Sequence, residues 1–207
     1  LVVYAQGQTR LTAKPVDINQ WMYSSFAKGK IPPFSFVYDG KHSADFIRTW
    51  SYSSTKLVSN EANVVRYSFV YESKGLGLKV ICDVDGYTDF NAVKWVLRFV
   101  NTGSGDSKIL REVKAIDIDL EYPEAGRFNL HSAEGNHISK ADFHPRTRIM
   151  YTGENYQVAP EGGRSSEVAF PFFNIESPAS QGVMFSIGWT GTWLANFVKK
   201  DDKTFSV

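Results

Sequence analysis

Apolar and polar residues alternate with a period of two along several stretches of this chain. The clearest stretch is 65–71, where Tyr67 and Phe69 fall on one face and Arg66 and Ser68 on the other. Two later stretches repeat the pattern, at 93–99 and 116–122. Alternation of this kind is typical of β-strands that bury one face.

Turn-forming residues separate the alternating stretches: Asp39-Gly40, Asp85-Gly86, Asn101-Thr102-Gly103, Gly135-Asn136, Gly162-Gly163 and Asp201-Asp202. Many short strands with almost no helical periodicity predict an all-β fold. We expect a large antiparallel β-sandwich, of the supersandwich type, with at most short helical turns. One such turn is expected at Ser43–Ile47, with Ser43 as its cap.

Length and composition indicate one globular domain over residues 1–207. The chain is 43% hydrophobic and 14% aromatic, which is enough apolar surface for a substantial core. Its formal net charge is +1 and like charges form no run, so we expect no nucleic-acid partner. No apolar stretch approaches the roughly 20 residues of a membrane span, so we expect no span.

The two ends of the chain allow further expectations. Leu1–Gln6 fits two interpretations: a first β-strand, or the tail of a signal peptide with Val3 and Ala5 before the cleavage site. The second implies a periplasmic or extracellular protein. After Asp202, residues 204–207 begin a new alternating strand and stop. We therefore expect a fragment of a longer protein.

Several motifs lie between Pro33 and Phe197: PFSFVYDG at 33–40, DFNAVKWVLRF at 89–99, NTG at 101–103, GGRSS at 162–166, PFFN at 171–174 and GWTGTW at 188–193. In this series the chain resembles the N-terminal β-sandwich domain of bacterial α-galactosidase-like enzymes of glycoside hydrolase family 36. It departs from the family pattern at Asn91, where the family has proline, and at Lys94, where the family has glutamate.

The resemblance implies a non-catalytic domain without cofactors. In that family the two catalytic carboxylates sit on a C-terminal barrel domain, the nucleophile within a Lys-Trp-Asp-type strand. Here the nearest string, Lys94-Trp95-Val96, has valine at that place. The implied partner is the catalytic barrel of the same polypeptide, an O-glycosyl hydrolase acting on galactoside-type carbohydrate. The sandwich would support the barrel and shape the active-site mouth.

Six residues are candidates for contact with a sugar or with another domain. Trp189 and Trp193 bracket a Thr-Gly turn, and Arg164 lies in the preceding Gly-rich loop. Their rings can stack on pyranose faces or anchor a domain interface, and the resemblance favours the interface. We expect the surface around these residues to be apolar.

The remaining candidates are His144, Arg146 and Trp50. In the string FHPRTR, His144 and Arg146 can meet hydroxyl groups or carboxylates of another domain, although salt bridges within the sandwich explain them as well. Trp50 would join Trp189 and Trp193 in a carbohydrate-binding module, which is the first alternative function.

The second alternative is a mutarotase-like sugar enzyme, in which His131 and Glu134 would act as acid and base. Whether the chain is itself an enzyme is thus left open. No metal site is expected, because the four histidines lack the spacing of a zinc pair. Asp117, Asp119 and Glu121 alternate along a strand, as on an ordinary solvated face.

Overall fold

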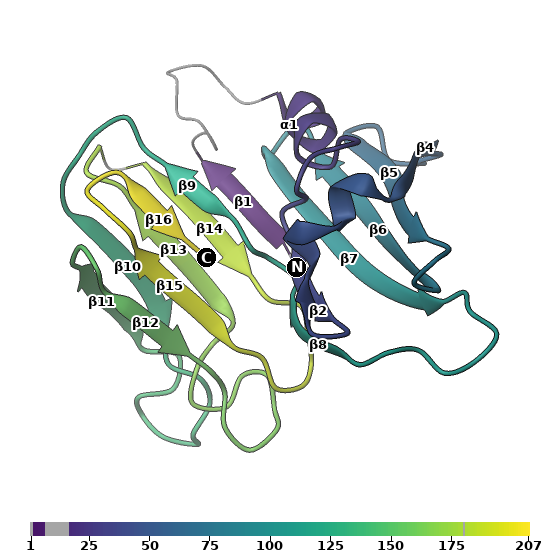
Figure 1. The fold of residues 1–207 in the computed structure, drawn as a ribbon. Coiled ribbons are helices and arrows are strands. Elements are labelled where there is room, and N and C mark those ends of the chain that lie inside the picture. Colours follow the sequence, from purple (N-terminus) through teal and green to yellow (C-terminus); the bar gives the residue numbers. More distant parts are fainter. Residues whose placement is uncertain (1, 7–16, 180) are drawn as a thin grey trace. The chain divides into compact units, whose positions relative to one another are not determined.

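The computed structural model describes residues 2–6, 17–179 and 181–207. They fall into two compact units (Figure 1). Of the described residues, 2–6, 118–179 and 181–207 belong to unit 1, and Asp17–Asp117 form unit 2. Antiparallel strands dominate both units, which confirms the all-β prediction. The assignment of 1–207 to one domain stays a prediction.

Unit 1 is built from two layers of strands. The first layer has the order β11-β10-β13-β14-β1, formed by Pro145–Met150, Phe128–Ala133, Phe172–Glu176, Gly182–Ser186 and Val2–Gln6. The second has the order β12-β15-β16-β9, formed by Asn155–Val158, Ala195–Lys199, Thr204–Ser206 and Asp119–Glu121. Val2–Gln6 is thus a strand, one of the two interpretations offered above, and Leu1 lies outside the described residues.

Phenylalanine rings join the two layers of unit 1. The ring of Phe173 on β13 lies 4.9 Å from that of Phe197 on β15, and Phe128 on β10 lies 6.0 Å from Phe205 on β16. All four side chains are buried. Aromatic pairs at such distances contribute packing energy beyond the area they bury, so they fix the layers against each other.

Unit 2 contains a larger and a smaller sheet. The larger has the order β7-β6-β5-β4, formed by Ala92–Asn101, Leu78–Tyr87, Val64–Ser73 and Ser51–Leu57. The smaller has the order β3-β2-β8, formed by Lys41–His42, Ser35–Tyr38 and Leu110–Lys114. Phe36 of β2 meets Phe99 of β7 at 5.2 Å, so the smaller sheet covers part of the larger one.

The period-two pattern of unit 2 separates a core face from a charged face. On β5, Tyr67 and Phe69 are buried, as predicted. On the opposite face Asp85 of β6 lies between two cations: its carboxylate is 3.2 Å from Nε of Arg66 and 2.9 Å from Nζ of Lys94. Cross-strand pairs of opposite charge stabilise a sheet and keep this face solvated. The turn expected at Asp85-Gly86 is wrong, because both residues lie within β6 and pair with β5 and β7.

The helix α1, Ile18–Ser25, was not predicted. Asp17 caps it, because its carboxylate accepts hydrogen bonds from the N–H groups of Asn19 and Gln20. Ile18 and Met22 are buried one turn apart. A short polar helix with one such pair gives little periodicity to detect. Among the described residues, no helix is long and apolar enough to cross a membrane.

The expected turn at Ser43–Ile47 is present as two short 3-10 turns, Ser43–Asp45 and Ile47–Thr49. The expected cap is wrong. Nδ1 of His42 accepts from the N–H of Ala44, whereas Ser43 is buried and its hydroxyl accepts from the N–H of Phe36.

Tyr71 offers a test of how α1 is held on the sheet. Its buried hydroxyl donates a 2.9 Å hydrogen bond to the carbonyl oxygen of Phe26, just after the helix. Tyr71→Phe leaves that carbonyl without its donor and should lower the free energy of unfolding by about 1–3 kcal/mol. Urea unfolding measures this. Tyr151→Phe, at an exposed tyrosine, is the control; equal stability of the two variants would contradict the account.

Candidate functional site

Three segments of unit 1 meet at one end of its strands: 134–144, 161–172 and 187–194. We call them the loop cluster. The N–H of Gly135 donates to the carbonyl of Val168 at 2.9 Å, and that of Asn136 to Ser166 at 2.7 Å. The N–H of Ile187 donates to Pro171 at 3.0 Å. Backbone hydrogen bonds therefore tie the three segments together, at the lower end of the unit in Figure 1.

The first two segments approach so closely that Gly135 is required. A Cβ atom at this position would lie 2.2 Å from the carbonyl oxygen of Ser166 and 2.7 Å from the nitrogen of Ala169. Backbone atoms cannot move aside as a flexible side chain does. Any other residue at position 135 would therefore separate the two segments.

Trp193 anchors the third segment and is part of the core. Its side chain is only 8% exposed. The indole N–H donates to the carbonyl of Ser165 at 2.8 Å, and the ring meets Phe173 edge-on at 5.7 Å. The expectation that Trp193 contacts a sugar or another domain is thus wrong, because the indole satisfies its one donor within the cluster.

Trp50 is also a core residue, and it belongs to unit 2. It is 6% exposed, and its ring stacks on Phe46 at 5.2 Å. The proposed role of Trp50 as a sugar platform is wrong as well, since a platform must face solvent. Only Trp189 of the three candidate tryptophans is exposed, at 66%.

Trp189 is one of several apolar side chains that the loop cluster exposes. The set comprises Ile138, Phe143, Phe172, Trp189 and Leu194. Two of its members join a ring series, because Phe170 lies 5.4 Å from Phe143 and 5.0 Å from Phe172. These five residues form what we call the apolar set. The cluster thus exposes apolar side chains as expected, and Trp189 alone of the predicted residues is among them.

Ile138 is the most exposed member, at 93%, and its backbone is strained. Its φ of +59° is rare for a β-branched residue. The carboxylate of Asp142 accepts from the N–H groups of His137, Ile138 and Ser139, at 2.8, 3.1 and 3.1 Å. These bonds hold the strained conformation and keep the pKa of Asp142 below its usual value. The sequence showed only a polar loop here.

Two arginines pair with carboxylates of the cluster: Arg164, which lies within it, and Arg146 of β11, which follows its first segment. Arg164 makes a two-point ion pair with Glu167, at 2.9 and 2.8 Å, which lowers the pKa of that carboxyl. Arg146 pairs with Glu134. His144 is exposed, and its carbonyl accepts from the N–H of Glu134. Of the two interpretations of Arg146, contact with a sugar or another domain and a salt bridge within the sandwich, the structure shows the salt bridge.

His131 has a carboxylate partner, but it is not Glu134. Its Nε2 lies 2.8 Å from Oε2 of Glu176 on β13, and its Nδ1 lies 3.0 Å from Oγ1 of Thr147 on β11. Hydrogen bonds from Asn129 and His131 keep the pKa of Glu176 below its usual value. The expected pair was wrong because His131 lies within a strand, β10, whose neighbours supply its contacts.

Metal ligands do not gather in the described part of the chain: no group of three His, Cys, Asp or Glu side chains there suits a metal ion. The carboxylates around β9 have other partners. Asp119 accepts from Nζ of Lys200 at 2.8 Å, and Asp117, which precedes the strand, accepts from the hydroxyl of Ser35.

No protein-family model matches this sequence, and no curated protein matches it. Solved structures do. The chain is similar to the α-galactosidase of Lactobacillus brevis, with a TM-score of 0.57 and 15% identity over 86% of this chain. The chain therefore shares its fold with part of this enzyme. It also matches a GH36 α-galactosidase, AgaA from Geobacillus stearothermophilus, in complex with stachyose (TM-score 0.55, 15% identity, 86% of this chain).

A third match is the galactosidase domain of the α-galactosidase-sucrose kinase AgaSK, with a TM-score of 0.56 and 12% identity over 86% of this chain. The chain covers 25% of the Lactobacillus chain and 26% of each of the other two. It thus spans about a quarter of the length of the solved structures that it matches.

Asp142 allows a test of the loop cluster. Because its pKa is lowered in the folded chain, its carboxylate supports the loop above the unfolded pKa, and this support is lost as the pH falls through the lower folded value. We expect Asp142→Ala to speed hydrogen exchange at the amides of His137, Ile138 and Ser139, by about tenfold. NMR exchange rates measure this. Asp106→Ala, in the exposed 102–109 loop, is the control, and unchanged rates in Asp142→Ala would refute the role of its carboxylate.

Proposed function

We propose that this chain is a non-catalytic sandwich domain of an α-galactosidase-like glycoside hydrolase. Its role is to support the catalytic barrel of the same polypeptide and to shape the active-site mouth. The observation that carries the proposal is the loop cluster, which exposes five apolar side chains on a backbone that internal hydrogen bonds hold in place.

The composition of the cluster suits an interface with another folded domain. Its exposed apolar set includes two phenylalanines and a tryptophan, which are residue types enriched at the centres of interfaces. The ion pairs Arg164–Glu167 and Arg146–Glu134 supply charged groups that are already neutralised. A partner that covers these two ion pairs would gain apolar burial from the apolar set without having to satisfy the charge of Arg164 or Arg146.

The fold similarity supports the proposal that the partner domain belongs to an α-galactosidase-like enzyme. The matched solved structures are α-galactosidases, and this chain covers only about a quarter of the length of each. One of them was solved with stachyose and another with 1-deoxygalactonojirimycin. We therefore propose that the enzyme of which this chain is a part acts on a galactoside. A periplasmic or extracellular location stays a proposal from the sequence of Val3 and Ala5, which in this structure lie in β1.

The two alternative functions each rest on one observation. A carbohydrate-binding module has a single exposed tryptophan, Trp189, on which to stack a sugar. A mutarotase-like enzyme has the pair of His131 and Glu176 as its acid and base. Neither has the assembled surface that the loop cluster offers to a neighbouring domain.

Activity assays separate the proposal from the mutarotase-like alternative. We expect the isolated chain to hydrolyse no aryl α-galactoside and to leave the mutarotation of galactose, followed by polarimetry, at the rate in buffer. The reason is that no catalytic carboxylate motif is present and that Glu176 is engaged by Asn129 as well as His131. Mutarotation above the buffer rate that is lost in His131→Ala would establish the alternative.

Sugar titration separates the proposal from the carbohydrate-binding module. A module would bind with millimolar affinity, near −4 kcal/mol. We expect galactose, melibiose and raffinose to leave tryptophan fluorescence and amide shifts unchanged up to about 10 mM. Saturable changes that disappear in Trp189→Ala, and persist in Trp193→Phe, would contradict the proposal.

A further inference from the structure

The outer strand β4 of unit 2 is an open sheet edge. In the described part of the chain β4 pairs only with β5, from Ser51 opposite Glu72 to Leu57 opposite Arg66. Six of its seven residues are exposed and the seventh, Tyr52, is half-buried. Alternate residues of such a strand direct unpaired N–H and C=O groups outward, so another strand can add to it.

Five other outer strands of the described sheets, β3, β8, β9, β11 and β12, are protected against such addition. Strands β3, β9 and β12 have two, three and four residues. Strand β11 begins with Pro145 and carries Arg146 and Arg148. Strand β8 is irregular, because Glu112 has a φ of +50° and the pairing with β2 shifts register. Short length, proline, charge and bulges are the usual devices that prevent edge pairing.

Strand β4 lacks nearly all of these devices. It has seven residues, a continuous register against β5, no proline and one charge, that of Lys56. Its centre, 53–55, carries only hydroxyl side chains, which are small and neutral. A second strand can therefore approach the centre without steric or electrostatic repulsion.

The sequence of β4 is complementary to itself. When two copies pair antiparallel over their full length, Ser54 faces Ser54 of the second copy on the two-fold axis. Lys56 then faces Tyr52, Ser53 faces Thr55, and Leu57 faces Ser51. No like charges oppose each other, and each lysine lies beside a tyrosine ring, which attracts a cation. An isologous contact of this kind closes as a dimer.

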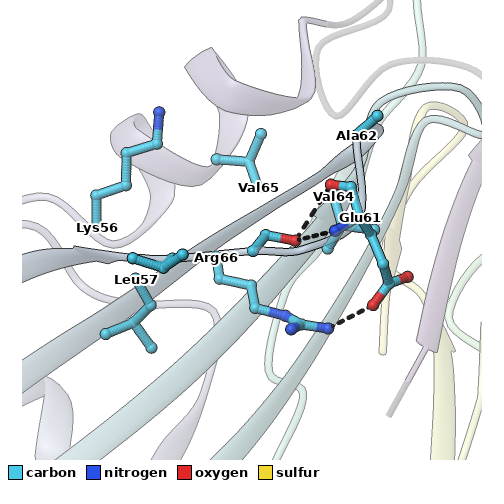
Figure 2. Close-up of a pocket in the computed structure, with 9 residues that line it drawn as sticks. Lys56, Leu57, Glu61, Ala62, Val64, Val65 and Arg66 are labelled. Carbon is cyan, nitrogen blue, oxygen red and sulfur yellow. Dashed lines mark hydrogen bonds and ion pairs between the residues drawn. The ribbon is translucent and has the colours of Figure 1, made fainter.

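We propose that two copies of this chain associate by antiparallel pairing of β4, which continues the sheet from one copy into the other. An open hollow of about 500 Å³ lies at the end of the strand, lined by Lys56 and Leu57 of β4 and by Val64 and Arg66 of β5 (Figure 2). Leu57 and Val58, which both line the hollow, are exposed and extend the contact. One edge pair buries less than a standard interface, so the dimer is weak and depends on concentration.

The test uses the two-fold axis at Ser54. Sedimentation and light scattering of the 207-residue chain should show a mass that rises from 23.3 kDa toward twice that value between about 10 μM and 1 mM. Ser54→Lys and Ser54→Glu should each remain at 23.3 kDa, because like charges meet on the axis. An equimolar mixture of these two variants should dimerise again, since opposite charges then meet there.

Two controls accompany the test. Ser104→Lys adds the same charge in an exposed loop of the same unit and should dimerise like the original chain. Ser54→Thr keeps a hydroxyl at the axis and should dimerise too. A chain that stays monomeric at about 1 mM would overturn the proposal. So would dimers of Ser54→Lys, which would place the contact elsewhere, or a mixture that fails to dimerise, which would exclude the Ser54 axis.

Discussion

The close pairing of two loop backbones at Gly135 determines the arrangement of the whole loop cluster. The N–H groups of Gly135 and Asn136 donate to the carbonyls of Val168 and Ser166, at a separation that leaves no room for a Cβ atom at position 135. This pairing brings Ser165 within reach of the indole of Trp193, and thereby places the third segment. The apolar set is exposed because the backbone beneath it is fixed in this way.

The cluster combines strain with exposure, which is unusual in a surface loop. Ile138 has a left-handed backbone and a side chain in solvent. Val168, whose carbonyl accepts from the N–H of Gly135, has a φ of +70°. Neither arrangement is favourable for an isolated chain. Asp142 and the cross-loop hydrogen bonds maintain them, so a partner of the kind proposed would not have to order these loops on binding.

The sequence predicted the architecture better than the site. Period-two alternation identified β5 and β7 of unit 2, where one face is largely buried, as at Tyr67 and Phe69. In the third alternating stretch, 116–122, only Asp119–Glu121 is a strand. The tryptophans were harder to interpret, since an indole that stacks on a sugar and one that closes a core have the same local sequence. Trp193 proved to be a core residue because its N–H meets the carbonyl of Ser165, a contact between segments 28 residues apart.

The residues that sequence reasoning missed depend on backbone geometry. Ile138 stands in a polar stretch that looks like an ordinary loop, and its role follows from the three N–H groups that Asp142 accepts. The partner of His131 was likewise assigned to a residue nearby in sequence, Glu134. The structure gives Glu176, because β13 lies beside β10 in the sheet.

The central claim is that a neighbouring domain of the same polypeptide covers the loop cluster. Hydroxyl-radical footprinting compares the 207-residue chain with the polypeptide that its gene encodes. The account predicts that Ile138, Phe143 and Trp189 are labelled in the chain alone and protected in the encoded polypeptide, whereas Val58, exposed on unit 2, is labelled equally in both. Equal labelling of Ile138, Phe143 and Trp189 in the two samples would contradict it.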